Sequence, residues 1–319
     1  MDASISIDRI REAATVVDPA FLHTPQFDCE PLSRHLGVST VLKVESVNPI
    51  RSFKGRGTDY LLHRLHEEGD GRAGLVCASA GNFGQGMAFA CRKRDRPLTV
   101  FAARSANPLK VERMRALGAR VELHGDDFDE AKEAAKRHAG ENGERYIEDG
   151  LLGAIAEGAG TMAVELGGAE PGLDAIFVPL GNGSLVNGVG TWLKHAAPTT
   201  RVIAVCAKSA PSMALSFAKS KPLDAPSTTI ADGIAVRVPV PAAVDLMQRT
   251  VDEVVLVDDD AMLAAMRRLL TDAGLVVEPA GAAGVAAIAQ RANGLAGKRV
   301  ATILTGGNLT EEQVREWLG

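Results

Sequence analysis

Short runs of β-branched and other apolar residues alternate with longer, alanine-rich runs over most of the chain. The apolar runs predict strands at 40–46, 74–79, 98–103, 120–125, 175–180, 201–207 and 299–305. The runs between them predict helices at 84–94, 108–118, 128–140, 159–168, 260–274 and 281–293. Such alternation is typical of α/β units with mostly parallel sheets, and this number of strands is enough for two sheets.

Composition narrows the classes of partner. The 319 residues are 46% hydrophobic and 24% charged, with a net charge of −5 and only 4% aromatic residues. This balance gives no general attraction to nucleic acid or to an anionic membrane. The four cysteines form no C-x-x-C pair, the N-terminus lacks an apolar signal core, and no apolar run is as long as a membrane span. We therefore expect a cytoplasmic protein without a nucleic-acid or membrane partner.

Three segments share one pattern, in which an apolar strand stops and a loop of small residues follows. They are SAGNFGQG at 79–86, PLGNGSLVNG at 179–188 and LTGGN at 304–308. Ligands of open α/β sheets bind at the carboxyl ends of strands, so these loops are candidate parts of one site.

The loop at 179–188 is a candidate phosphate site. Gly181, Gly183 and Gly188 flank Asn182 and Ser184, and a helix is predicted from residue 186. Glycines let backbone amides approach a ligand, and the helix adds the positive end of its dipole. The loop matches neither G-x-G-x-x-G nor a Walker sequence, so a tight turn without a ligand is the alternative.

The other two loops are ambiguous by themselves. Ser79 and Asn82 could donate hydrogen bonds to a carboxylate, or they could simply cap the following helix. Thr305 could be a functional hydroxyl or only the last residue of a strand.

A lysine in NPIRSFKGRG, residues 48–57, adds a reactive group. Lys54 lies between Phe53 and Gly55, in a segment where serine, proline and glycine are expected to interrupt regular structure. The segment is either a basic turn or a loop that holds a reactive amine. Together with the phosphate and anion loops, the amine favours pyridoxal phosphate, which needs a lysine, a phosphate site and a partner for its ring nitrogen.

Five motifs, in this order and spacing, carry a family resemblance: SFKGRG, SAGNFGQG, GNGSL, VEPAGA at 277–282 and TGGN. The chain resembles the pyridoxal-phosphate enzymes of the tryptophan-synthase β family (fold type II), and within them the serine/threonine dehydratase branch. The resemblance implies an α/β fold of two open, twisted, mostly parallel sheets flanked by helices. It also implies a large cofactor-binding domain of residues 1–71 and 150–319, and a small substrate-closing domain of residues 72–149.

The resemblance implies roles for individual residues. Lys54 matches the lysine that forms a Schiff base with the cofactor, and Phe53 matches the residue beside the cofactor ring. Asn82 matches the asparagine that binds the ring 3′-oxygen, and Thr305 matches the hydroxyl that faces the ring nitrogen. The substrate carboxylate is assigned to Ser79, Ala80, Gly81 and Asn82, and the phosphate to Gly181, Asn182, Gly183, Ser184 and Leu185.

Two positions depart from relatives in this branch. Serine racemases have a serine where this chain has Ala80, and that serine exchanges a proton on the face opposite the lysine. Many relatives also have a metal-binding glutamate near the position of Cys206. We therefore predict that racemisation is disfavoured and that this divalent-metal site is absent or altered, so that no metal ligand is assigned.

The expected function is that of an ammonia-lyase. It would remove ammonia from a β-hydroxy amino acid such as L-threonine or L-serine by α,β-elimination, leaving a 2-oxo acid. Lys54 would take the Cα proton, and the β-hydroxyl would leave with the help of a proton donor such as the cofactor phosphate. We expect a homodimer acting on a small amino acid. The alternatives are a serine racemase, another β-elimination or β-replacement enzyme, and a non-catalytic metabolite-binding protein.

Overall fold

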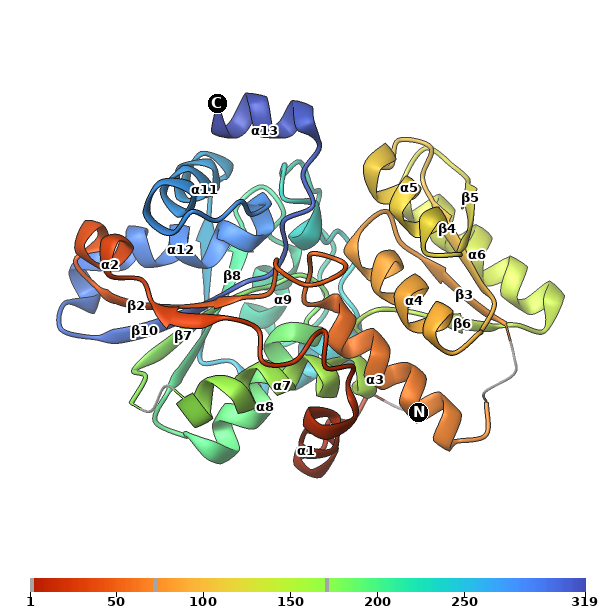
Figure 1. Ribbon diagram of the computed structural model, residues 1–319, viewed down its shortest axis with the longest axis horizontal. Coiled ribbons are helices and arrows are strands. Elements are labelled where there is room, and N and C mark those ends of the chain that lie inside the picture. The colour runs from red at the N-terminus through yellow and green to blue at the C-terminus, as the bar shows by residue number, and fades with distance from the viewer. Residues whose placement is uncertain (1–2, 71–73, 170–171) are drawn as a thin grey trace.

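Two separate β-sheets organise the computed structural model, which describes residues 3–70, 74–169 and 172–319 (Figure 1). One sheet has the order β1-β2-β10-β7-β8-β9 and the other the order β5-β4-β3-β6. Neighbouring strands are parallel except for β1 and β2, which are antiparallel. The strands are β1 Gln26–Asp28, β2 Ser39–Val44, β3 Leu75–Ala78, β4 Leu98–Ala102, β5 Arg120–Leu123, β6 Arg145–Ile147, β7 Ala175–Pro179, β8 Arg201–Ala207, β9 Glu253–Val257 and β10 Arg299–Leu304. The predicted fold class is confirmed.

Helices cover both sheets. They are α1 Ile7–Val16, α2 Glu30–Leu36, α3 Lys54–Glu67, α4 Asn82–Lys93, α5 Pro108–Ala116, α6 Phe128–Asn142, α7 Gly153–Ala169, α8 Ser184–Ala196, α9 Ser212–Lys219, α10 Pro241–Thr250, α11 Asp259–Ala273, α12 Pro279–Arg291 and α13 Glu311–Leu318, with short 3₁₀ turns η1 Asp232–Ile234 and η2 Ala292–Leu295. Helix α3 lies between the two sheets in Figure 1. Its residues Leu61 and Leu65 share a hydrophobic cluster with Leu75 and Cys77 of β3.

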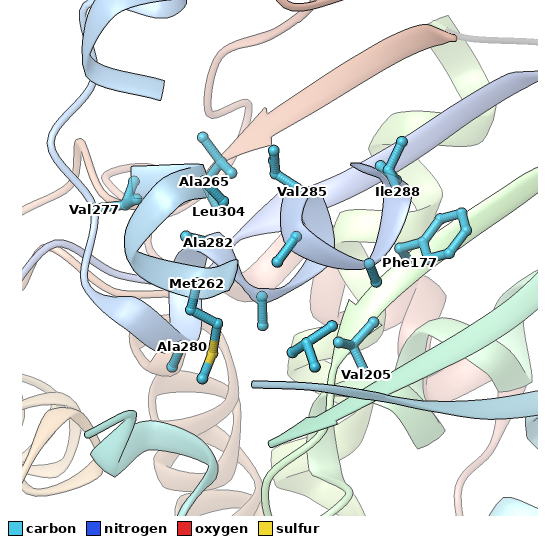
Figure 2. Close-up of a cluster of buried hydrophobic side chains, with 14 of the residues drawn as sticks. Phe177, Val205, Met262, Ala265, Val277, Ala280, Ala282, Val285, Ile288 and Leu304 are labelled. Carbon is cyan, nitrogen blue, oxygen red and sulfur yellow. The ribbon is translucent and has the colours of Figure 1, made fainter. Parts of the chain in front are cut away.

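The strands of the larger sheet are apolar on both faces because helices bury both. In β7, Phe177 points into the cluster that α11 and α12 form, whereas Ile176 and Val178 point into the cluster on the side of α7 and α8. Figure 2 shows the first cluster, with Phe177 and Val205 of the sheet packed against Val285 and Ile288 of α12. Parallel strands buried in this way read as continuous apolar runs rather than alternating ones, which is why the sequence revealed them.

All seven predicted strands occur within two residues of the expected positions. Strands β1, β6 and β9 lie outside the predicted runs. Among the described residues, no helix is long and apolar enough to cross a bilayer.

Candidate active site

Lys54 is the first residue of α3, so the expected interruption of regular structure is present over residues 48–53 and is wrong from Lys54 onward. The glycines next to it lie within the helix, at positions where other elements pack too closely for a side chain. A Cβ on Gly55 would lie 2.2 Å from the ring of Phe21, and one on Gly57 would lie 2.5 Å from the backbone oxygen of Ile155. The small residues therefore allow α3 to approach its neighbours and fix the position of its N-terminus.

Arg56, two residues after Lys54, anchors α3 in a buried network of ion pairs. Arg56 is fully buried and binds Glu45 through Nε at 3.0 Å and Nη2 at 2.9 Å. Its Nη1 binds Glu165 at 2.6 Å, and Glu165 also pairs with buried Lys43. Burial opposes the charge of Arg56, but the two carboxylates outweigh that effect and raise its pKa. The arginine of SFKGRG is thus a structural anchor beside the reactive lysine.

The side chain of Lys54 lies in a cavity of about 360 Å³ between the two sheets. The cavity brings together every loop singled out in the sequence. Its lining includes Phe53, Lys54, Ser79, Ala80, Gly81, Asn82, Gly181, Asn182, Gly183, Ser184, Leu185 and Thr305. Phe53 and Lys54 lie at the start of α3, and the others follow the carboxyl ends of β3, β7 and β10 or begin the helices after them. This is where ligands of open parallel sheets bind.

Asp149 is the polar partner of Lys54, and the sequence analysis did not identify it. Lys54 Nζ donates to Asp149 Oδ2 at 2.6 Å, and Ser184 Oγ donates to Asp149 Oδ1 at 2.9 Å. The side chain of Asp149 is 10% exposed. Asp149 follows β6, a three-residue strand without a β-branched run, and recognition of that strand would have been the signal for it.

The loop after β7 has the geometry of an anion site. Gly183 has φ +95° and directly precedes α8, whose 13 residues begin at Ser184. A Cβ on Gly181 would lie 2.7 Å from the backbone oxygen of Gly233, so both glycines are needed for this path of the chain. The free amides of the first turn of α8 and the helix dipole favour a phosphate there.

Ser79 stabilises the start of α4 through its hydroxyl oxygen. This oxygen accepts hydrogen bonds from the amides of Gly81, at 3.2 Å, and Gly84, at 2.9 Å. The N-cap residue of α4 is Gly81 rather than Ser79 or Asn82, but Ser79 binds an amide of the first turn from two residues before it, on the same loop that lines the cavity.

Asn82 belongs to a buried polar network that includes a second residue not singled out in the sequence. Asn82 Nδ2 donates to Glu278 Oε1 at 2.6 Å, and Asn308 Nδ2 donates to Asn82 Oδ1 at 2.8 Å. Burial raises the pKa of Glu278, while Lys110, 3.7 Å away, opposes this effect. Glu278 is the acid of the VEPAGA motif, and the sequence predicted no role for it. The proposed contact of Asn82 with a cofactor oxygen stays a prediction.

Thr305 and Phe53 are joined through their backbones. Thr305 is buried at the end of β10, and its backbone oxygen accepts from the amide of Phe53 at 3.0 Å. The Phe53 ring centroid lies 4.7 Å from Lys54 Nζ. This hydrogen bond therefore fixes the end of β10 relative to the start of α3, where both line the cavity.

Two ion pairs join the two sheets at the cavity. Lys110 of α5 binds Asp232 of η1 at 2.5 Å, and Arg237 binds Asp129 of α6 at 2.5 Å. All four side chains line the cavity. The segment 232–237 thus contacts both α5 and α6 across the opening between the sheets.

Cys206 is the residue at which the resemblance implied the loss of a metal ligand. Its thiol is buried in β8, and its Sγ donates to the backbone oxygen of Ala210 at 3.8 Å. Burial raises the pKa of this thiol to about 12. The absence of metal at this position remains a prediction.

Comparison with known proteins gives consistent matches. A family model described as "Pyridoxal-phosphate dependent enzyme" matches residues 17–306. L-threonine ammonia-lyase of Thermotoga maritima is 35% identical over 306 residues, which are 96% of this chain and 76% of that protein. Across eight curated relatives, the chain spans from 50% to 77% of their lengths.

Solved structures are similar over nearly the whole chain. The processed form of threonine deaminase isoform 2 from Solanum lycopersicum has a TM-score of 0.90 at 28% identity, covering 99% of this chain and 94% of that one. Maize serine racemase has a TM-score of 0.91 at 28% identity, covering 98% and 96%. Two different reactions are therefore represented among the structures that this chain resembles.

Proposed function

We propose that this chain, which belongs to the family of pyridoxal-phosphate-dependent enzymes, is an ammonia-lyase for a β-hydroxy amino acid such as L-threonine or L-serine. The observation that carries the proposal is the position of Lys54 Nζ, which lies in the cavity that the 181–185 loop also lines. A curated relative named L-threonine ammonia-lyase matches 96% of the chain and supports the choice of reaction. The products would be a 2-oxo acid and ammonia.

The residues of the cavity fit pyridoxal phosphate. Lys54 offers an amine, the loop Gly181–Leu185 offers the amides of a helix N-terminus for the phosphate, and buried Thr305 offers a neutral hydroxyl for the ring nitrogen. The cofactor supplies an electron sink that weakens the bond between Cα and hydrogen of a bound amino acid. Phe53 and Asn82 complete the wall around the ring in this proposal.

The chain's own residues would then orient the substrate and move its protons. The loop of Ser79 to Asn82 presents polar groups to the substrate carboxylate. Lys54 takes the proton from Cα, as an amine near the reacting carbon can. Ion pairs such as Lys110–Asp232 hold the two sheets together and support closure of residues 72–149 over residues 1–71 and 150–319. Closure would exclude water during the reaction.

Racemisation is the second candidate because maize serine racemase has a TM-score of 0.91 with this chain. Ala80 argues against it. Its methyl group lines the cavity where a racemase of this branch has a proton-exchanging serine. Elimination is therefore the preferred reaction.

We also propose that the chain acts in the cytoplasm as a homodimer. The thiols of Cys29, Cys77, Cys91 and Cys206 are free and buried, which suits a reducing compartment. Light scattering after size-exclusion chromatography would measure the mass of the particle in solution. The mass of a monomer would contradict the proposed homodimer.

The decisive experiment starts from the colour of the purified protein. A Schiff base with Lys54 gives a yellow protein that bleaches with borohydride, and peptide mass spectrometry then finds the adduct on Lys54. A panel of β-hydroxy amino acids is scored for ammonia and oxo-acid release. Lys54→Ala should reduce turnover by at least roughly 10²–10⁴-fold, whereas Lys136→Ala, on the outer surface of α6, should not. Wild-type turnover by Lys54→Ala would refute the assignment.

A further inference from the structure

The carboxylate of Asp149 connects the reactive amine to the loop proposed for the phosphate. One oxygen accepts from Lys54 Nζ at 2.6 Å and the other from Ser184 Oγ at 2.9 Å. Because its side chain is 10% exposed, the carboxylate depends on these partners to offset the loss of water. Asp149 thus touches the nitrogen atom that reacts.

The local backbone is built to bring Asp149 to this place. Strand β6 pairs in parallel with β3, so its carboxyl end opens onto the same cavity as the loop of Ser79. Gly150 follows with φ +90°, and a Cβ there would lie 2.9 Å from the backbone oxygen of Asn182. Only glycine allows the end of β6 to approach the 181–185 loop so closely.

The neighbouring carboxylate has a different partner. Glu148 forms an ion pair with Lys132 of α6. The two consecutive acids therefore form ion pairs with two different lysines, and Asp149 is the one that pairs with Lys54.

Elimination of a β-hydroxyl group requires that a proton leave Cα and that a proton reach the departing oxygen. The Cα proton moves to Lys54 Nζ, and the hydroxyl is a poor leaving group until its oxygen receives a proton. After the first transfer, Lys54 is an ammonium in direct hydrogen-bond contact with a carboxylate. A proton transferred to Asp149 and from there to the departing oxygen would close the cycle.

We propose that Asp149 is a second catalytic residue, which takes a proton from Lys54 Nζ and donates it to the departing β-oxygen. This inference rests on the proposed ammonia-lyase function. The Cα–H and Cβ–O bonds break, a new O–H bond forms, and water leaves with the proton that came from Cα. Lys54 returns to its neutral amine and Asp149 to its carboxylate, so no further reactant is needed.

Comparison of two leaving groups tests the proposal. Chloride departs from β-chloro-L-alanine without a proton, whereas hydroxide from L-serine needs one. For Asp149→Asn, we expect kcat/KM for L-serine to fall roughly 10²–10⁴-fold, the usual contribution of one acid–base group. The value for β-chloro-L-alanine should change by no more than about tenfold, since no proton donor is lost for chloride and only the basicity of Lys54 is altered. Equal losses with both substrates, or no loss with L-serine, would overturn the proposal; the latter would favour the cofactor phosphate as proton donor.

Two further measurements separate a chemical role from damage to the fold. Asp149→Asn should still bind pyridoxal phosphate at Lys54, as shown by borohydride trapping and peptide mass spectrometry. The pH midpoint of the cofactor's visible absorbance should fall by about one unit or more, because an opposite charge beside the nitrogen has been removed. An unchanged midpoint would overturn the contact on which the proposal depends.

A matched control and the wild type complete the design. Glu133→Gln removes an exposed carboxylate from α6 and should leave both substrates and the absorbance unchanged. If the wild type releases ammonia from neither amino acid, the proposed function fails. The absorbance titration would still decide whether Asp149 acts on Lys54.

Discussion

Arg56 and Glu45 form a two-point ion pair in which neither side chain is exposed to solvent. Without Glu45, Glu165 is the one carboxylate left to offset the buried charges of both Arg56 and Lys43. We expect Glu45→Ala to lower the free energy of unfolding by about 3–5 kcal/mol. Urea unfolding of the purified protein measures this loss.

The exposed pair of Arg34 and Glu30 on α2 is the matched control for that experiment. Glu30→Ala should cost no more than about 1 kcal/mol, because solvent screens an exposed pair. If the two variants lose similar amounts, the buried network does not stabilise the start of α3.

Glu157 makes the stability of the fold depend on pH. Its side chain is fully buried, its Oε1 accepts from the amide of Ser6 at 2.9 Å, and its Oε2 has no hydrogen-bond partner among the described residues. Burial raises the pKa of Glu157 from 4.5 to about 7. Between these values the folded protein retains a proton that the unfolded chain has lost, so the free energy of unfolding falls as pH rises.

The variant Glu157→Gln removes this titration, since an amide stays neutral. Relative to wild type, its free energy of unfolding should increase by up to about 3 kcal/mol from pH 4.5 to pH 8, at about 1.4 kcal/mol for each pKa unit. Urea unfolding at both ends of this range gives the two differences. If the difference in unfolding free energy between Glu157→Gln and wild type is the same at both pH values, Glu157 has an ordinary pKa.

Gly183 tests the proposed phosphate loop. In Gly183→Val, a Cβ would lie 3.0 Å from Ala243 Cβ and 3.2 Å from Asn187 Nδ2, at a φ of +95° that valine resists. We expect weaker binding of pyridoxal phosphate, measured by titrating the apoprotein and following absorbance. Gly274→Val is the control, because Gly274 also has a positive φ but ends α11 with no atom within 4 Å of its added Cβ. It should reduce stability and leave cofactor affinity unchanged; equal affinity in both variants would remove Gly183 from the site.

The sequence predicted the parts of this molecule that depend on local patterns. Strand β7 was found because burial on both faces makes it continuously apolar. Helix α3 was missed because glycines usually oppose helices. They are tolerated here because Gly55 packs against Phe21 and Gly57 against Ile155, both distant in sequence. Packing between distant segments overrode a local preference at that point.

In the candidate site, too, local patterns were predicted from the sequence and contacts between distant residues were not. Loops with family motifs could be assigned because their residues are adjacent in the chain. Asp149 lies 95 residues from Lys54 and is brought to it by the pairing of β6 with β3, which no local pattern reveals. Glu278 and Asn82 meet across 196 residues in the same way. Such partners are found from tertiary structure, because sequence spacing carries no information about them.

Ala80 provides the test of reaction specificity. It lies on the loop after β3 and lines the cavity together with Lys54, but its methyl group carries no exchangeable proton. We therefore expect the unmodified protein to form pyruvate from L-serine much faster than D-serine. In Ala80→Ser, the added hydroxyl supplies a second proton carrier, and racemisation should rise relative to elimination.

Chiral chromatography of the serine left after partial turnover, together with pyruvate release, measures the two rates in one sample. Ala103→Ser is the control, since it adds the same hydroxyl to a buried residue just after β4. It should not change the ratio of the two rates, because Ala103 contributes no atom to the reaction in our proposal. If the unmodified protein makes D-serine faster than pyruvate, another group must already exchange protons with Cα. The racemase assignment would then be preferred, because elimination could no longer be attributed to the missing hydroxyl at position 80.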